Sequence, residues 1–194
     1  TGVYANSGGH EHMRSYYSKS DEVQLYPQLL RKAGYYCTNN VKEDFNINPD
    51  QTKDVWDELG KEAHYRNRPA GKPFFAIFNS TITHESSLHT SVPTEELRHK
   101  PEDVVLPPYH PDTEELRHDW AQYYDKMEDM DTWVGTILKE LEESGEAENT
   151  IVFYYADHGG VLGRSKRFVY ETGTRVPFIV YIPEKYKHLY PASK

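Results

Sequence analysis

The chain has 194 residues, which is enough for one domain with a sizeable hydrophobic core. Its formal net charge of -9 argues against a nucleic-acid-binding surface, which needs a basic footprint. Aromatic residues make up 13% of the chain, more than a disordered protein carries, so we expect a packed structure. The sequence contains no apolar run long enough to span a membrane.

The first predicted elements are a short helix and a strand. The apolar residues between Pro27 and Gly34 share one helical face, with the proline suited to the first turn and the glycine to the position after the last turn. Residues 35–37 then read as a short strand. It contains the single cysteine, Cys37, which has no basic neighbour in sequence and is predicted to be a buried, unreactive thiol.

Three apolar runs further along the chain are predicted to be buried strands. They cover residues 74–78, 151–156 and 178–182. Runs that are apolar on both faces are typical of a parallel sheet covered by helices.

A long amphipathic helix is predicted from about residue 113 to residue 143. Asp112 is the expected N-cap, Glu115 would complete a capping box, and Gly145 suits the end. Apolar residues recur along it at alternating spacings of four and three, which places them on one stripe facing the sheet. The stripe consists of Leu116, Trp120, Tyr123, Met127, Met130, Val134, Ile137 and Leu141.

Together these elements predict an α/β fold with a mainly parallel central sheet flanked by helices. The order strand, long helix, strand is the pattern of a βαβ crossover. In such folds the functional site lies beyond the carboxyl ends of the strands, and the candidate residues follow from that rule.

Asp157 and His158 directly follow the apolar run 151–156, and two glycines come next. A carboxylate and an imidazole side by side could bind a divalent cation, with oxygen favouring Ca²⁺ or Mg²⁺ and nitrogen extending the choice to Mn²⁺ or Zn²⁺. The alternative is that Asp157 closes a turn and His158 is simply exposed.

Three further residues near strand ends could act on an anionic substrate. Lys166 could stabilise charge on an anionic oxygen, and Lys42 could be a second such lysine. His84 could donate to an anion or protonate a leaving group. The alternatives are a solvated basic loop, a surface lysine and an ordinary loop histidine.

A small polar cluster of His10, His12 and Arg14 lies near the start of the chain. Two histidines two positions apart face the same way only on an extended strand. They could line a substrate pocket, and the alternative is a loop without a function.

Several of these segments, taken in order, resemble the sulfatase family of the alkaline-phosphatase superfamily. Residues 157–159, Asp-His-Gly after an apolar strand, resemble the family's late metal-binding motif. Lys166 and the block Tyr-Glu-Thr-Gly-Thr-Arg-Val-Pro at 170–177 resemble its lysine followed by Glu-x-Gly-x-Arg-x-Pro. Residues 73–78 leading to Thr83-His84 resemble the strand that delivers its sulfate-contacting histidine.

Two earlier segments extend the resemblance over nearly the whole chain. Residues 30–36, Leu-Arg-Lys-Ala-Gly-Tyr-Tyr, are similar to the family's helix-to-strand turn. Thr1-Gly2 look like the close of its Cys-x-Pro-Ser-Arg segment. Residues 36–42 and 10–14 look like a bacterial subgroup near the heparan N-sulfatases.

The resemblance implies roles for individual residues. Asp157 and His158 would be calcium ligands, and Lys166 and His84 would contact the sulfate. Lys42 would match the lysine of the family's Gly-Lys-x-His type motif, although Asp44 stands where that motif has its histidine.

The resemblance also implies that residues 1–194 form part of a sulfatase catalytic domain. The formylglycine nucleophile and the paired aspartates of the first metal-binding strand would lie upstream of Thr1, and the C-terminal part would follow the strand 178–182. Such a segment would be inactive by itself.

For the complete protein, the resemblance implies hydrolysis of sulfate esters or sulfamates, with a sulfated glycan as the preferred substrate. A periplasmic or extracellular location is favoured for such an enzyme. Two alternatives stay open: a phosphodiesterase or phosphonate hydrolase of the same superfamily, and a non-catalytic binding relative that kept the fold.

Overall fold

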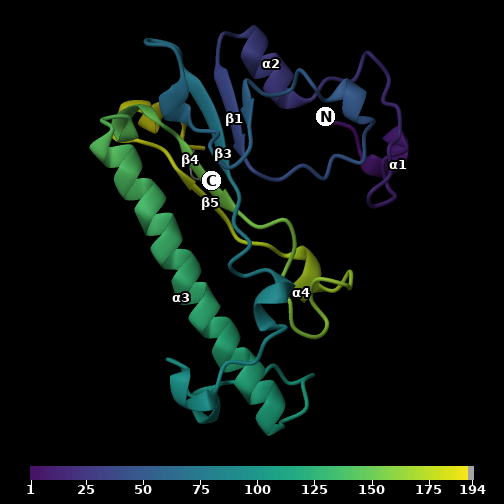
Figure 1. The fold of residues 1–194 in the computed structure, drawn as a ribbon, viewed down its shortest axis with the longest axis vertical. Coiled ribbons are helices and arrows are strands. Elements are labelled where there is room, and N and C mark those ends of the chain that lie inside the picture. The colour runs from purple at the N-terminus through teal and green to yellow at the C-terminus, as the bar shows by residue number, and fades with distance from the viewer. Residues whose placement is uncertain (192–194) are drawn as a thin grey trace. The chain divides into compact units, whose positions relative to one another are not determined.

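The computed structural model describes residues 1–191. They fall into two compact units, Thr1–Asn79 and Ser80–Lys194 (Figure 1). Each unit has its own sheet. None of the helices among the described residues is long and apolar enough to cross a membrane.

The first unit is built around a parallel three-stranded sheet in the order β2-β1-β3. The central strand β1 pairs with β3 from Tyr36 opposite Phe74 to Asn40 opposite Phe78. The parallel sheet confirms the predicted α/β class. The helices and strands of the first unit are α1 (Ala5–Gly8), α2 (Tyr26–Lys32), β1 (Tyr36–Asn40), β2 (Glu58–Leu59) and β3 (Phe74–Phe78).

The predicted helix and strand around Gly34 are confirmed. Pro27 occupies the first turn of α2, and Gly34 has a φ of 96°, a left-handed conformation that glycine adopts without strain. The chain then enters β1, which extends to Asn40 and is therefore longer than predicted.

The hydrophobic core of the first unit forms around β1. Its buried members are Leu25, Cys37, Ile47, Val55 and Trp56. Cys37 is fully buried and its Sγ lies 3.6 Å from the carbonyl oxygen of Pro27. The predicted burial of the cysteine is thus confirmed, and because burial raises the pKa of the thiol to about 11, we continue to predict that it is unreactive.

The second unit consists of one long helix and a two-stranded sheet. Its elements are α3 (Glu114–Glu143), β4 (Val152–Tyr155), α4 (Glu171–Thr174) and β5 (Phe178–Tyr181). The predicted strands at 151–156 and 178–182 are both present, but β4 and β5 pair antiparallel, with Val152 opposite Tyr181. The expectation that they belong to a parallel arrangement is wrong for this pair.

Three strands, β3, β4 and β5, are less buried than predicted. All five residues of β3 are half-buried, and β4 alternates between half-buried and exposed positions. The expected crossover is also not seen in residues 1–191, because β3 belongs to the three-stranded sheet and β4 to the two-stranded one. An apolar run in the sequence does not show which element packs against each face of the strand that it forms.

The N-cap of the long helix α3 lies one residue later than predicted. Thr113 is the N-cap, and its Oγ1 accepts from the amide of Leu116. Asp112 was predicted to cap the helix but instead forms an ion pair with Arg117. At the other end Gly145 has a φ of 75°, which confirms the predicted stop.

The apolar stripe of α3 is only partly confirmed. Met130 and Leu141 are buried, whereas Met127 is 43% exposed. The helix also buries two polar residues, Gln122 and Asp125. The Gln122 side chain accepts from the amide of Val92 and donates to two carbonyl oxygens in the same loop, so α3 holds a loop through hydrogen bonds as well as through apolar contacts.

Candidate functional site

Asp157 and His158 lie two and three residues beyond the end of β4 and face one another. The Nε2 of His158 is 3.5 Å from Oδ1 of Asp157, and its Nδ1 is 2.7 Å from the carbonyl oxygen of Gly159. A histidine that binds a metal usually donates its other ring N–H to a carbonyl or carboxylate, which fixes its orientation. The Gly159 contact fits that arrangement and leaves Nε2 beside the carboxylate oxygen, so one cation could contact both atoms.

The turn after His158 requires glycine. A Cβ at Gly159 would lie 1.8 Å from the carbonyl oxygen of Thr172, and the Gly159 amide donates to the carbonyl of Gly173 at 2.9 Å. A Cβ at Gly173 would in turn lie 2.4 Å from the carbonyl oxygen of Ser165. The backbone at Gly159 therefore lies close to Thr172, and the backbone at Gly173 lies close to Ser165, the residue before Lys166. Glycine, which has no Cβ, allows both approaches.

A backbone hydrogen bond connects the Lys166 loop to the Asp157–His158 turn. The Lys166 amide donates to the carbonyl oxygen of Gly160 at 2.9 Å. The main chain at Lys166 is therefore placed relative to His158 by backbone geometry.

The side chain of Lys166 reaches His84, which lies 82 positions earlier in the sequence. The Nζ of Lys166 is 3.2 Å from Nε2 of His84. His84 is the N-cap of the short 3₁₀ helix Glu85–Leu88. The structure thus brings together two of the predicted anion-contacting residues within the second unit.

The ring of His84 has partners at both nitrogens. Its Nδ1 lies 2.9 Å from the hydroxyl of Ser86 and 3.2 Å from the amide of the same residue. A lysine ammonium can only donate, so the Lys166 contact requires Nε2 to accept and Nδ1 to carry the proton toward the Ser86 hydroxyl. When the Ser86 amide donates to Nδ1 instead, the proton is on Nε2, and this tautomer can donate it to another group.

Glu85 provides the negative charge of this group. Its Oε2 lies 3.4 Å from Nζ of Lys166 and its Oε1 lies 2.6 Å from a guanidinium nitrogen of Arg167. The hydrogen bond from Arg167 lowers the pKa of Glu85, and Lys166 adds to that effect, so the carboxylate stays ionised at neutral pH.

Lys42 lies in the first unit, two residues beyond β1. The buried Asn39 side chain donates to the carbonyl oxygen of Lys42 at 2.9 Å, and Asn79 donates to Oδ1 of Asn39 at 2.8 Å. Asn39 and Asn79 come at the carboxyl ends of adjacent parallel strands. The sequence analysis missed both, although a polar side chain ending an apolar strand is a visible signal.

The early cluster, also in the first unit, is irregular and not an extended strand. His10 packs edge-on against Tyr17 with a ring separation of 5.4 Å, whereas His12 is exposed. Arg14 has a φ of 61°, and its amide donates to Asn46. The two histidines therefore do not share the face of a strand, and a substrate-binding role for the three residues stays a prediction.

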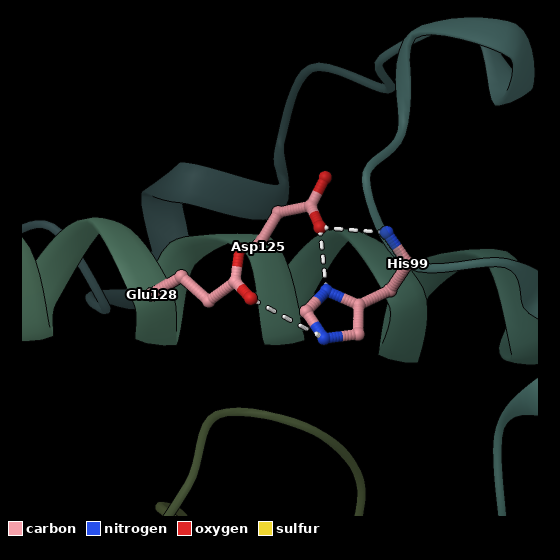
Figure 2. A group of neighbouring side chains, drawn as sticks. All are labelled: His99, Asp125 and Glu128. Carbon is pink, nitrogen blue, oxygen red and sulfur yellow. Dashed lines mark hydrogen bonds and ion pairs between the residues drawn. The ribbon is translucent and has the colours of Figure 1, made fainter.

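A further group with metal-ligating atoms was not predicted from the sequence. Figure 2 shows His99 against the α3 residues Asp125 and Glu128, whose candidate ligand atoms lie within 4.8 Å of one another. Asp125 and Glu128 are three residues apart on a helix, a spacing that is visible in the sequence. His99 lies 26 residues before Asp125, so no local pattern links it to them.

The internal hydrogen bonds of this group explain it without a metal. Asp125 accepts from the amides of Arg98 and His99 and lies 2.7 Å from Nδ1 of His99. The guanidinium of Arg98 lies 2.8 Å from Glu128. That cation occupies one oxygen of Glu128, and the other lies 3.8 Å from Nε2 of His99, so these contacts attach the 98–99 loop to α3.

Comparisons with known proteins identify relatives of this chain. The full chain, residues 1–194, matches the family model described as Sulfatase. An ulvan-active sulfatase of Formosa agariphila is 35% identical over 95% of this chain and 38% of its own length. The human N-sulphoglucosamine sulphohydrolase is 34% identical over 43% of this chain and 17% of its own length.

A solved structure shares the α/β fold. It is that of a protein in complex with its substrate D-glucosamine-2-N,6-O-disulfate, with a TM-score of 0.60 and 18% identity over 95% of this chain and 60% of the other. The chain spans less than two fifths of the ulvan-active relative. Because the family model matches the whole chain and a sulfatase is 35% identical over 95% of it, the chain belongs to the sulfatase family.

Proposed function

We propose that the complete protein hydrolyses sulfate esters or sulfamates, with a sulfated glycan as substrate. The observation that supports this most directly is the contact between Lys166 and His84, in a loop that a backbone hydrogen bond joins to the Asp157–His158 turn. Relatives named for ulvan and for N-acetylglucosamine-6-O-sulfate point to glycans.

The sulfatase family is generally metal-dependent, and Asp157 and His158 are the residues that we propose would hold the cation, with Ca²⁺ as its identity. A bound cation supplies a Lewis acid that polarises the sulfuryl group. The 3.5 Å separation of the two candidate ligand atoms and the Gly159 contact of His158 fit this role.

Lys166 would offset the negative charge that develops on the sulfuryl oxygens. In the structure its Nζ lies 3.2 Å from Nε2 of His84, and an anionic oxygen is a stronger acceptor for the ammonium than an imidazole nitrogen. When the ammonium turns to the sulfate, His84 can hold its proton on Nε2, with Nδ1 accepting from the Ser86 amide, and donate that proton to the leaving oxygen or nitrogen. We propose the same charge-offsetting role for Lys42.

The nucleophile does not come from Cys37. This thiol is fully buried and its pKa is raised to about 11, so it is protonated at neutral pH and cannot reach a substrate to attack it. We propose that a formylglycine elsewhere in the complete protein provides the nucleophile.

The test is the rate of the complete protein on an aryl sulfate, with Lys166→Ala as the variant. Loss of one preorganised donor should lower kcat roughly a hundredfold. Lys187→Ala is the matched control, because it removes a lysine from an exposed ion pair with Glu184. A wild-type rate for Lys166→Ala would contradict the role of Lys166, and a preference of the wild-type protein for aryl phosphate over aryl sulfate would indicate a phosphoesterase.

A further inference from the structure

Glu85 lies at the centre of the charged group beside the proposed site, and the proposed mechanism does not use it. Its two carboxylate oxygens face two different cations, Lys166 at 3.4 Å and Arg167 at 2.6 Å. Lys166 in turn contacts His84. The result is a chain of contacts from carboxylate to ammonium to imidazole.

The local backbone makes Glu85 and His84 a fixed pair. They are consecutive, and in the tautomer that accepts from Lys166 the ring of His84 is held at Nδ1 by the hydroxyl of Ser86. A lysine side chain has four rotatable bonds, and holding it in one conformation costs rotamer entropy. Two partners on one rigid turn restrict where the Lys166 ammonium can be.

The charges around Lys166 also restrict the position of its ammonium. Lys166 and Arg167 are adjacent in sequence and both positive. The carboxylate of Glu85 lies between them and offsets their repulsion. Both Lys166 and Glu85 are only about a quarter exposed, with side-chain exposures of 23% and 27%, so solvent screens this interaction less than it would a surface pair.

We propose that Glu85 is a positioning residue that orients the Lys166 ammonium toward His84 before substrate binds. The inference rests on the proposed function of Lys166. Glu85 does not itself contact the sulfate, because a carboxylate would repel it. Its contribution is to preorganise a donor, which matters most in the transition state.

This role predicts a specific split between kinetic constants. In Glu85→Gln the lysine loses its anionic partner, so kcat should fall roughly 10- to 100-fold, the range expected when a catalytic group is misplaced by about 1 Å. KM should stay unchanged or fall, because the substitution removes a negative charge near an anionic substrate. Partial unfolding would also lower the apparent kcat at an unchanged KM, so kcat is expressed per folded protein, and recovery in a variant that keeps the charge distinguishes positioning from folding.

The experiment measures kcat and KM of the complete protein on an aryl sulfate for the wild type, Glu85→Gln, Glu85→Asp and Glu184→Gln. Glu184→Gln removes a carboxylate from an exposed ion pair with Lys187 and should match the wild type. Glu85→Asp keeps the charge and should recover at least several-fold of the kcat lost in the glutamine variant. Thermal unfolding of each variant shows whether it is folded. If Glu85→Gln is not folded, the kcat of Glu85→Asp is compared with that of the wild type instead.

A wild-type kcat for Glu85→Gln, or a raised KM with unchanged kcat, would overturn the positioning role. The failure of the underlying function looks different. If the wild-type protein does not hydrolyse sulfate esters, the proposed function itself is wrong. If the wild type is active and Lys166→Ala is impaired while Glu85→Gln is not, only the inference about Glu85 is wrong.

Discussion

Asp125 shows how one buried carboxylate can hold a loop. Burial by itself would raise the pKa of Asp125, but hydrogen bonds from the His99 side chain and from the amides of Arg98 and His99 outweigh burial and lower it. A lowered pKa in the folded state means that the carboxylate stabilises the fold above the pKa of the unfolded chain, near 4. This contribution disappears as the pH falls through the folded pKa.

Asp125→Asn should therefore destabilise the complete protein by roughly 1–3 kcal/mol at neutral pH, because it leaves buried donors without an ionised acceptor. The difference in melting temperature from the wild type should shrink as the pH falls below about 4. Thermal unfolding across this pH range measures it. Asp131→Asn is the control, since it removes the same charge from an exposed position on the same helix. A gap that does not depend on pH would contradict the role given to Asp125.

At the scale of single residues, the sequence predicts those site members whose neighbours are local. Asp157 and His158 are adjacent and follow an apolar strand, so their proximity is visible without a structure. The contact of His84 with Lys166 spans 82 positions and follows from tertiary packing. Only the resemblance to a family placed these two residues in one site, because no local pattern links them.

At the scale of the element, the turn after β4 makes a sharp prediction about two adjacent glycines. A Cβ at Gly159 would lie 1.8 Å from the carbonyl oxygen of Thr172, while the nearest atom to a Cβ at Gly160 is 3.7 Å away. Gly159→Ala must therefore move backbone, and that backbone carries the Asp157–His158 turn and the loop of Lys166.

Gly159→Ala should lower both the melting temperature and the aryl sulfatase rate of the complete protein severely, whereas Gly160→Ala should fold normally. The comparison of the two alanine variants is the measurement, with thermal unfolding for the fold and kcat for the site. Equal behaviour of the two variants would show that the backbone approach at Gly159 is not required.

The elements themselves differ in how far the sequence determined them. The helix ends at Gly34 and Gly145 were predicted because a left-handed residue after a helix has a strong local signature. The antiparallel pairing of β4 with β5 was not predicted, because the direction of a strand depends on its pairing partner, and an apolar run does not identify that partner. The choice of Thr113 over Asp112 as N-cap depended on Arg117, which competes for the aspartate.

At the scale of the whole molecule, the proposed cation should contribute to the stability of the complete protein as well as to its rate. A ligand that binds only the folded state raises the melting temperature by mass action. Prolonged chelation should therefore lower both the melting temperature and the aryl sulfatase rate, and added Ca²⁺ should restore them. Asp157→Asn should bind less metal by elemental analysis and show a smaller response to chelator.

Lys187→Ala should respond to chelation like the wild type, because its ion pair with Glu184 is exposed on a separate turn. A complete protein whose metal content, melting temperature and rate are indifferent to chelation would contradict a cation at Asp157 and His158. Recovery with Zn²⁺ or Mn²⁺ but not with Ca²⁺ would correct the identity of the ion and leave its location unchanged.

The hydrogen bond between the Lys166 amide and the Gly160 carbonyl closes a small ring of main chain. Within such a ring the number of residues is constrained more strongly than their identity, since the side chains of residues 161–165 do not form the bond. Insertion or deletion of one residue there would shift the lysine along the chain relative to its bonding partner. Natural variation in this segment is therefore expected to keep its length, and to exchange side chains less at Gly163, which lies close to His110, and at Arg164, which has a φ of 65°.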